Sequence, residues 1–366
     1  MELLGWSADG GVFAGWVSVG GNATDAGICY HPFYNDESTI TNISSQGLIV
    51  KSITAEVLFL PESSELKFLP EGPIDLGGGK FSWVGIQHGA DSQVGSLNVY
   101  DLNTQTNDSF PLKGRPGFAL PTVNSGQFII GLERRVELFD IRGGKPDVVC
   151  EGVDADFENT IINDGVACSQ GVIFGTKHLE FSEKIAGLYF LRMSDRKLFP
   201  LRGGQICSNG KVILEDTPES ISFLDIDTPT KSVVKYVLNP QDGTLSEPET
   251  VLDLNDVDAF PDGMVGTADG KGVIISFYNP EPAEFGETRY YSLESKSCEI
   301  LWQTPKSPQN TCPLLMEWEG RVQLLITTAV EHMSVERQSE SNNAGALFIA
   351  ETPYDVAFAT TLVPLM

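Results

Sequence analysis

The stretch FLPEGPIDLGGGKFSWVGI, residues 68–86, decides the fold. Glu71 stands before a Gly-Pro pair, in which Gly72 permits unusual backbone angles and Pro73 fixes one. The segment GGGK (77–80) lacks the glycine spacing of a phosphate-binding loop and precedes an apolar strand, so we interpret it as a hairpin. A carboxylate held in this way at the start of a strand is either a turn residue or a ligand.

Three later stretches favour the ligand interpretation of Glu71. Each places an oxygen-bearing side chain beside a glycine: NDG (163–165), SNG (208–210) and PDG (261–263). Their intervals match those between the blades of a propeller. The alternative is that they are ordinary hairpins, because Asn-Gly is a common signal for a type I′ turn.

The charge of the chain limits its partners. The 366 residues carry a formal net charge of −26 and a sequence pI near 4.4. Such an acidic chain is not expected to bind nucleic acid or an anionic membrane surface through charge. Cationic substrates and divalent metals are compatible with it, although an acidic surface is also a common feature of soluble proteins.

The cysteines and the N-terminus predict a cytoplasmic protein. The six cysteines are widely scattered, with no CxxC pair or His/Cys cluster, so a zinc–thiolate site is not expected and free thiols are. The opening MELLGWSADGG has no basic segment followed by a long apolar run, and no stretch of 18 apolar residues occurs. The sequence therefore predicts neither a signal peptide nor a membrane span.

The pattern of short strands predicts an all-β protein. Residues 1–50 are interpreted as an N-terminal extension, and residues 51–366 as one domain of short β-rich runs separated by turn clusters. One type of strand recurs at intervals of roughly 50 residues. Its copies are GSLNVYDL (95–102), RVELFDI (135–141), GLYFLRM (187–193), VVKYVLN (233–239), TRYYSLE (288–294) and GALFIAE (345–351).

Six copies predict a six-bladed propeller with four-stranded blades around a central channel. The turns at the ends of the innermost strands would bring Glu71, Asn163, Asn209 and Asp262 together from four different blades. A propeller must also tie its last blade to its first, because an open ring leaves unpaired strand edges. We expect AEVLFL (55–60) to close the ring by pairing with ALFIAE (346–351).

From Ala55 to Ile349 the chain resembles the senescence marker protein 30/gluconolactonase/luciferin-regenerating-enzyme-like family. The stretches that carry the resemblance are LPEGP (69–73), INDG (162–165), DTPTKSVVKYVLNPQDGTLS (227–246) and FPDGM (260–264), with a weaker likeness in 327–348. Their order and spacing make the set specific.

The resemblance implies one divalent metal ion as cofactor in the channel, with Ca²⁺ preferred and Zn²⁺, Mn²⁺ or Mg²⁺ as alternatives. The family's metal ligands fall on Glu71, Asn209 and Asp262, with Asn163 close by. The chemistry of these residues agrees, because two carboxylates and two amide oxygens form a hard, all-oxygen donor set.

The substrate positions differ more from the family. Ile161 stands where the family usually has a substrate-contacting arginine, which suggests a more apolar substrate than a sugar lactone. Asp164 and Glu180 are candidates to contact substrate or to assist a base. Lys177 and His178 follow a strand expected to end at the channel mouth, so they are further candidates.

These features predict a metal-dependent hydrolase of a lactone or ester, acting on a small molecule. The metal would polarise the carbonyl and lower the pKa of a bound water, and Asp262 would act as general base. No GxSxG motif supports an α/β-hydrolase triad. The alternative is a non-catalytic, metal-stabilised propeller that acts as a binding or scaffold protein, because a fold does not determine a function.

Overall fold

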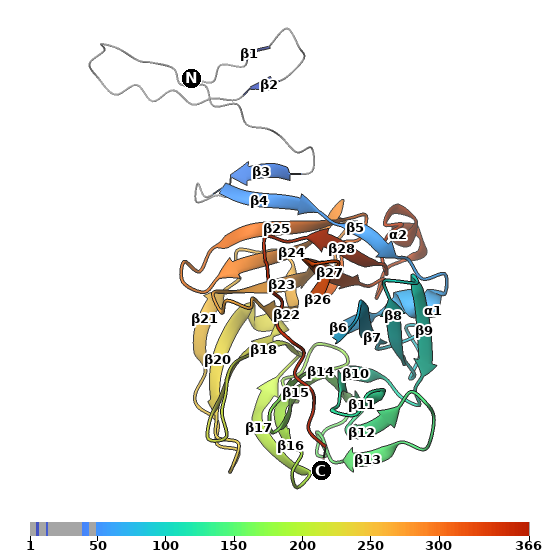
Figure 1. The fold of residues 1–366 in the computed structure, drawn as a ribbon, viewed down its shortest axis with the longest axis vertical. Coiled ribbons are helices and arrows are strands. Elements are labelled where there is room, and N and C mark those ends of the chain that lie inside the picture. The colour runs from blue at the N-terminus through green and yellow to red at the C-terminus, as the bar shows by residue number, and fades with distance from the viewer. Residues whose placement is uncertain (1–4, 7–11, 14–38, 44–48, 366) are drawn as a thin grey trace, which may run out of the picture. The chain divides into compact units, whose positions relative to one another are not determined.

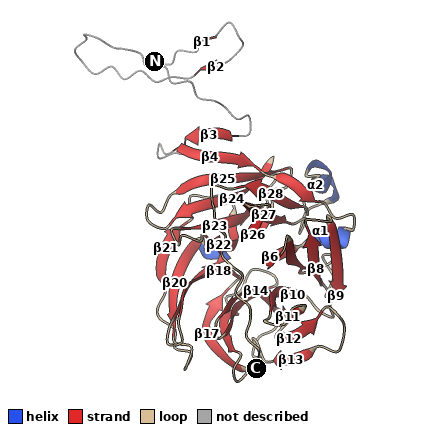
Figure 2. Cartoon of the chain, viewed as in Figure 1, coloured by secondary structure: helices blue, strands red, loops and turns tan. Residues whose placement is uncertain are grey.

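The structure is a computed structural model that describes residues 5–6, 12–13, 39–43 and 49–365. The chain divides into two units between residues 37 and 38. The first contains a small antiparallel pair, β1 (Gly5–Trp6) and β2 (Val12–Phe13). The second consists of six sheets arranged around a common axis, almost entirely strand (Figures 1 and 2). The prediction of an all-β, six-bladed propeller is confirmed.

Each blade is a meander of antiparallel strands that runs outward from the axis. Blade 1 contains β6 (Pro70–Gly77), β7 (Lys80–Gly85), β8 (Ser96–Asp101) and β9 (Thr106–Pro111). Blade 2 contains β10 (Pro116–Pro121), β11 (Gln127–Leu132), β12 (Arg135–Asp140) and β13 (Asp147–Cys150). Blade 3 contains β14 (Thr160–Cys168), β15 (Gly171–His178), β16 (Ala186–Arg192) and β17 (Lys197–Gln205).

Of the remaining three blades, blades 5 and 6 also include strands from the N-terminal side of the domain. Blade 4 contains β18 (Ser208–Asp216), β19 (Ile221–Asp227), β20 (Ser232–Leu238) and β21 (Glu249–Asp253). Blade 5 contains β22 (Phe260–Gly266), β23 (Gly272–Tyr278), β24 (Phe285–Ser292) and β25 (Cys298–Pro305), to which β4 (Ile49–Thr54) and β3 (Thr39–Ile43) are added. Blade 6 contains β26 (Asn310–Trp318), β27 (Arg321–Thr328), β28 (Leu347–Glu351) and β5 (Glu56–Phe59).

The last blade is completed by a strand from the start of the domain. β5 pairs antiparallel with β28, with Leu347 opposite Phe59 and Ile349 opposite Glu56. The expected ring closure is therefore confirmed. The preceding strand β4 pairs in parallel with the outer edge of blade 5, so two adjacent segments of chain join two neighbouring blades.

The recurring strand recognised in the sequence has one structural meaning. Its six copies overlap β8, β12, β16, β20, β24 and β28, which are the third strands of the six blades. The more apolar run before each copy is the second strand, which is buried between neighbouring blades. The repeat therefore marks equivalent positions around the ring.

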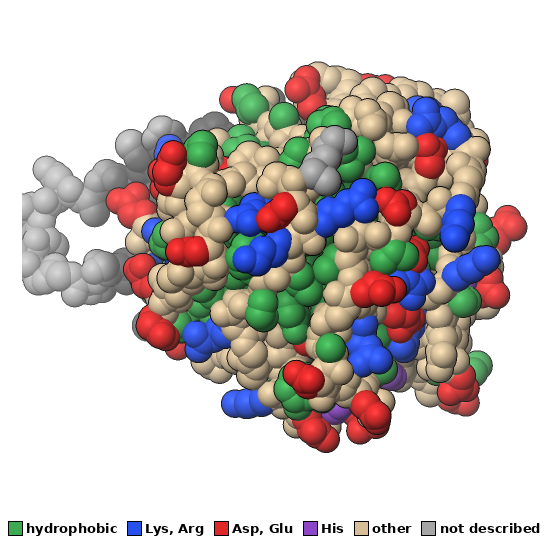
Figure 3. All heavy atoms as spheres, turned by 90° about the horizontal axis from the view of Figure 1, so that it is seen from below, with side chains coloured by type: hydrophobic (Ala, Val, Ile, Leu, Met, Phe, Trp, Pro, Cys, Tyr) green, Lys and Arg blue, Asp and Glu red, His purple; other side chains and the backbone are tan. Residues whose placement is uncertain are grey.

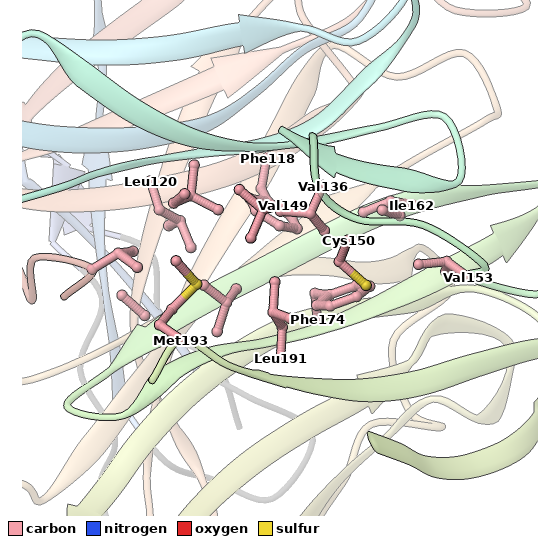
Figure 4. Close-up of a cluster of buried hydrophobic side chains, with 14 residues drawn as sticks. Phe118, Leu120, Val136, Val149, Cys150, Val153, Ile162, Phe174, Leu191 and Met193 are labelled. Atoms are coloured by element: carbon pink, nitrogen blue, oxygen red, sulfur yellow. The ribbon is translucent and has the colours of Figure 1, made fainter. Parts of the chain in front are cut away.

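One apolar cluster fills each junction between neighbouring blades. Figure 4 shows the junction of blades 2 and 3, where Phe118, Leu120 and Val136 meet Phe174 and Leu191. Phe118 and Phe174 lie 5.8 Å apart between ring centroids. Because each blade is flat and apolar on both faces, the core of this protein is a ring of interfaces rather than one central mass.

The innermost strand of every blade is irregular at the same place. Its pairing with the second strand shifts register in all six blades: Glu71/Ile74, Pro116/Phe118, Ile162/Asp164, Asn209/Val212, Pro261/Met264 and Asn310/Pro313. Such bulges bend a strand and redirect a side chain. The glycine motifs therefore lie within strands, and the expectation of turns or type I′ hairpins at these positions is wrong. The GGGK segment, by contrast, does form the hairpin between β6 and β7.

Short helices lie outside the sheets. They are α1 (Ser64–Phe68), α2 (Val335–Glu340) and the 3₁₀ turn η1 (Thr228–Thr230). Within the described part of the chain, no helix has the length and apolar character needed to cross a membrane. The five cysteines there, Cys150, Cys168, Cys207, Cys298 and Cys312, are free thiols, as the sequence predicts.

The chain that follows β28 crosses one end of the central channel. Tyr354 packs edge-on against Tyr290 of blade 5, and the Thr360 hydroxyl donates to the Asp75 carbonyl of blade 1. Val363 is fully buried and pairs with the end of blade 2. Between this tail and the opposite mouth lies a cavity of about 370 Å³, lined by inner-strand residues and by residues 358–361.

The surface carries both signs of charge. Acidic and basic side chains are interspersed with apolar ones over the face in Figure 3. Acidic and basic side chains of the domain also form ion pairs, such as Arg115 with Glu133 at 2.8 Å and Arg192 with Asp195 at 2.7 Å. On this face the basic residues do not gather into a separate patch.

Ring closure predicts that two truncations behave differently. Deleting residues 1–62 removes β5 and leaves β28 as an open edge, so we expect loss of cooperative thermal unfolding and aggregation. Deleting residues 1–48 keeps β4 and β5 and should leave a cooperative transition. Calorimetry and size-exclusion chromatography of both truncations test this, and a soluble, cooperative protein lacking residues 1–62 would contradict it.

Candidate functional site

Four predicted ligand residues occupy corresponding positions near the starts of innermost strands. Glu71 is in β6, Asn163 in β14, Asn209 in β18 and Asp262 in β22. All four are at or beside the register shifts, and they come from blades 1, 3, 4 and 5. The structure therefore brings them to one mouth of the channel, as the sequence analysis expected.

The two asparagines are linked directly. The Asn163 amide donates from Nδ2 to Asn209 Oδ1 at 2.9 Å and to the Ser208 carbonyl at 3.0 Å. Both amide nitrogens also face the Cys207 sulfur, at 3.6 Å from Asn163 and 3.4 Å from Asn209. The nitrogens are thus turned toward protein groups, which leaves Asn163 Oδ1 without a donor among the described residues.

The DTPT stretch (227–230) holds this arrangement from behind. Asn209 Nδ2 donates to the Thr228 hydroxyl at 2.9 Å, and that hydroxyl donates to the Pro261 carbonyl, also at 2.9 Å. Asp227 Oδ1 accepts from the backbone amides of Ile206 and Cys207. One threonine therefore ties the position of Asn209 to the strand that carries Asp262.

Backbone proximity explains a glycine of the SNG motif. Gly210 has φ of +35°, and a Cβ there would lie 2.7 Å from the Asp262 carbonyl oxygen. Any larger residue would push blades 4 and 5 apart at the site. Gly72 similarly has φ of +51°, which places its amide 2.8 Å from Oε2 of its neighbour Glu71.

The two carboxylates are held in an environment that disfavours their charge. Burial, followed by the nearby charge of Asp164, raises the pKa of Glu71 to about 8. Burial and the charge of Glu71 raise the pKa of Asp262 well above its ordinary value. Neither oxygen of Asp262 accepts a hydrogen bond from the described residues. Among the described residues, no counter-charge is in direct contact with these two neighbouring carboxylates, of which Glu71 is half-buried and Asp262 buried.

A buried charged network lies beside the site, and the sequence analysis missed it. Lys211, whose side chain is fully buried, lies 3.3 Å from Asp225 Oδ1 and 4.0 Å from Asp164 Oδ2. Its Nζ also donates to the Ser208 hydroxyl at 3.0 Å. Gln205 donates to the other Asp225 oxygen at 2.8 Å. The signal was a lysine directly after the SNG motif and directly before the apolar run VIL (212–214).

The predicted substrate residues divide into two groups. Asp164 lines the cavity, and burial raises its pKa despite the opposing charge of Lys211. Lys177 is 6% exposed, at the end of β15. Ile161 is 1% exposed and belongs to an apolar cluster with Leu69.

The other two substrate candidates belong to the loop after β15. His178 is buried, and its Nδ1 accepts from the backbone amides of Ser182 and Glu183 at 3.2 and 3.1 Å. It therefore fixes the fold of this loop. Glu180 is exposed in the loop.

Two further residues near the site were not predicted. The charge of Glu331, from the loop after β27, raises the pKa of both Glu71 and Asp262. Its carbonyl accepts from the Tyr278 hydroxyl at 3.1 Å. Cys312, at the bulge of β26, is a half-buried thiol whose pKa is raised by desolvation and then by the charge of Glu71. Glu331 lies in the stretch 327–348, where the family likeness is weak.

The donor set fits a divalent cation. Glu71 and Asp262 supply two carboxylates, and Asn163 and Asn209 supply amide oxygens, a combination that hard cations prefer. Among the described residues, no group of three or more His, Cys, Asp or Glu side chains is arranged to hold a metal. A cation at this mouth would therefore depend on the asparagines as well as on the two carboxylates.

The comparisons with known proteins agree with this geometry. A family model described as SMP-30/Gluconolactonase/LRE-like region matches residues 69–330. The chain belongs to this family. The match begins at the LPEGP motif and ends just after β27, so it includes all four predicted ligand residues.

Relatives of this SMP-30/gluconolactonase/LRE-like propeller cover most of its length. A Bacillus subtilis protein named "Putative sugar lactone lactonase YvrE" is 29% identical over 296 residues, 79% of this chain and 93% of its own. Regucalcin from Agrobacterium tumefaciens, described as a calcium-binding protein, superposes with a TM-score of 0.69 at 18% identity, covering 86% of this chain and 98% of its own. A luciferin-regenerating enzyme superposes at 0.68 and 18% identity, covering 81% and 95%. At these identities the two structures show the shared fold.

The buried carboxylates predict an unusual pH dependence for this family propeller when divalent cations are removed. Glu71 keeps its proton in the folded protein up to a pKa of about 8, whereas its ordinary value is 4.5. Between these values the unfolded chain binds fewer protons, so stability falls as pH rises from about 5 to about 8. The melting temperature in chelator should therefore decline across this window.

Two variants and one addition complete this experiment. Glu71→Gln should flatten the decline, whereas Glu62→Gln, at an exposed position, should not. Saturating Ca²⁺ should oppose the decline, because a cation is held by the ionised carboxylates and stabilises by about 2.7 kcal/mol at one hundred times its Kd. Equal slopes for wild type and Glu71→Gln would show that Glu71 is not the titrating group.

Proposed function

We propose that this protein is a divalent-metal-dependent hydrolase of a lactone or ester. The observation that carries the proposal is the pair of neighbouring carboxylates, half-buried Glu71 and buried Asp262, with no cationic group of the described residues in direct contact. Burying such a pair costs free energy that a bound cation would recover. The amides of Asn163 and Asn209 complete a donor set at the same mouth.

The comparisons support this proposal at the level of reaction class. The family's description includes gluconolactonase, and the Bacillus subtilis relative is named as a sugar lactone lactonase. The calcium-binding description of the Agrobacterium structure is compatible with a divalent cation as cofactor. Ca²⁺ is the preferred candidate, and Zn²⁺, Mn²⁺ and Mg²⁺ are alternatives.

When bound, the cation supplies Lewis-acid polarisation of the substrate carbonyl and lowers the pKa of water. Glu71, Asn209 and Asp262 would hold it, and Asn163 would orient Asn209 through the hydrogen bond between their amides. The Thr228 hydroxyl keeps Asn209 Nδ2 engaged, and Asn209 Oδ1, which already accepts from Asn163 Nδ2, would use its second lone pair toward the cation. These residues come from separate blades, so their spacing is fixed by the ring.

Asp262 is the proposed general base. Its carboxylate would accept the proton of the attacking water as the water oxygen bonds to the carbonyl carbon. The C–O bond to the leaving alkoxide would then break, and the protonated Asp262 would return the proton to that alkoxide. Burial and the neighbouring charge of Glu71 raise the pKa of Asp262 in the cation-free protein, and a bound cation would oppose that rise and keep the carboxylate ionised. Asp164 lies near enough to raise the pKa of both ligand carboxylates, and it would assist by holding the same water.

The proposed substrate side of the site is formed by β14, β15 and the loop that follows. Lys177 contacts the substrate directly, while His178 holds the loop that carries Glu180. Ile161 gives this side an apolar interior. We also propose a cytoplasmic location, since the five described cysteines are unpaired.

The chelator test distinguishes this enzyme from its alternative, a metal-stabilised binding or scaffold protein. A panel of small lactones and aryl esters is assayed after demetallation and again with each cation. We expect turnover that chelator abolishes and that one or more cations restore. Absence of turnover with every cation, together with a chelator-induced fall in melting temperature, would favour the scaffold.

Substitutions at Asp262 separate its two proposed roles. Asp262→Asn keeps one ligand oxygen but removes the basicity, so it should retain cation binding by calorimetry while kcat falls by about 10²–10⁴. Asp262→Ala should lose both. The matched comparison is Glu71→Gln, which should weaken cation binding but recover turnover at high cation concentration. Full activity of Asp262→Asn at saturating cation would assign the base elsewhere.

A further inference from the structure

Lys177 stands out because its charge is buried without a partner. Lys177 is only 6% exposed. Its Nζ nevertheless makes no hydrogen bond or ion pair with any residue in the described part of the chain. The Nζ atom lies over the Phe181 ring, 5.7 Å from the ring centroid. Lys211, by comparison, is buried with two carboxylates and a hydroxyl around its ammonium. A buried ammonium normally has such partners.

Its place in the fold directs Lys177 toward the candidate site. Lys177 pairs with Ile161 of β14 on one side and bridges to Cys207 at the start of blade 4 on the other. Its positive charge lowers the pKa of Glu71 in blade 1 and of Asp262 in blade 5. Because the Lys177 charge acts on carboxylates from two different blades, Lys177 lies at the mouth of the channel and not at the outer edge of one blade.

Neither carboxylate is close enough to satisfy this ammonium. The carboxylate oxygens of Glu71 and Asp262 both lie more than 4.0 Å, the limit for an ion pair, from Lys177 Nζ. A cation bound by these two residues would also occupy their oxygens. Asp164 lies within 4.0 Å of Lys211, and Glu331 lies 3.8 Å from His332. With a cation bound, Lys177 would therefore keep three N–H donors and no acceptor among the described residues.

We propose that Lys177 binds a carboxylate on the substrate, so that the natural substrate is a lactone or ester bearing a carboxylate group. This inference rests on the proposed function, which supplies the lactone or ester bond that is hydrolysed. It adds that the substrate carries a carboxylate next to that bond. The carboxylate would receive a charge-assisted hydrogen bond from Nζ. The Phe181 ring, which is 43% exposed, lies 5.7 Å from Nζ and would cover one side of that bond.

The test compares probes that differ in one charge. 5-Oxotetrahydrofuran-2-carboxylate and its carboxamide are assayed as substrates with the cation-loaded protein. We expect kcat/KM to favour the carboxylate by about tenfold or more, mainly through KM, as for hydrogen bonds to charged groups. Lys177→Met should bring this ratio close to one, and Lys177→Arg should restore part of it. Lys184→Met removes a charge from the exposed side of the same loop and should keep the wild-type ratio.

A binding experiment separates this inference from the proposed hydrolase activity. 5-Oxoproline is the lactam counterpart of the carboxylate probe and resists hydrolysis, so its binding is measured by calorimetry beside that of its amide. If 5-oxoproline binds in a way that depends on Lys177 but no lactone is turned over, the carboxylate-binding role of Lys177, here called the anion site, would stand and the proposed hydrolase activity would be refuted. Turnover of both lactones with equal kcat/KM in wild type would refute the anion site alone.

A third outcome addresses the charge-balance explanation. If Lys177 does no more than offset Glu71 and Asp262, Lys177→Met should tighten the binding of Ca²⁺ and leave the preference between carboxylate and carboxamide unchanged. That result would overturn the inference. Loss of the preference in Lys177→Met, with the melting temperature maintained, would support it.

Discussion

The pairing of β5 with β28 is the constraint on which the rest of this structure depends. Each blade buries apolar residues on both faces, so each needs a neighbour on either side. The strand pair joins the start of the domain to its end, and the junction between blades 6 and 1 is then filled by residues such as Trp83 and Met316. Loop-closure entropy opposes this long-range pairing, and the last apolar interface compensates for it.

Once the ring is closed, the spacing of the candidate site is no longer adjustable. The proposed ligand residues lie at bulges on separate inner strands, and short contacts such as Gly210 against the Asp262 carbonyl fix how closely those strands approach. Thr228 then fixes side-chain orientation across one blade boundary. Backbone geometry sets the distances between ligands, and a few hydrogen bonds set their direction.

The electrostatics of the site show two different treatments of buried charge. Lys211 and Asp225 neutralise each other within a network of hydrogen bonds, which lets both remain deep in the protein. Glu71, Asp262 and Lys177 have no such network of charged and hydrogen-bonding partners among the described residues. Burial and the neighbouring carboxylates therefore raise the pKa values of Glu71 and Asp262. Unsatisfied buried charge of this kind concentrates at functional sites, because ligands provide the missing partners.

The sequence by itself determined the class of fold and the residues of the proposed metal site. A six-fold repeat of strands is a local pattern, and it survives in the structure as the six third strands. The glycine motifs were visible as well, but their conformation was not: whether Asn-Gly forms a turn or a bulge depends on the strand beside it. The tertiary structure alone decided that Lys211 is paired and Lys177 is not. In the sequence, Lys211 follows a glycine and Lys177 lies near the end of a strand, and neither pattern shows whether the lysine is paired. The difference arises from Asp225 on a strand next to Lys211, whose carboxylate reaches the Lys211 ammonium but not that of Lys177.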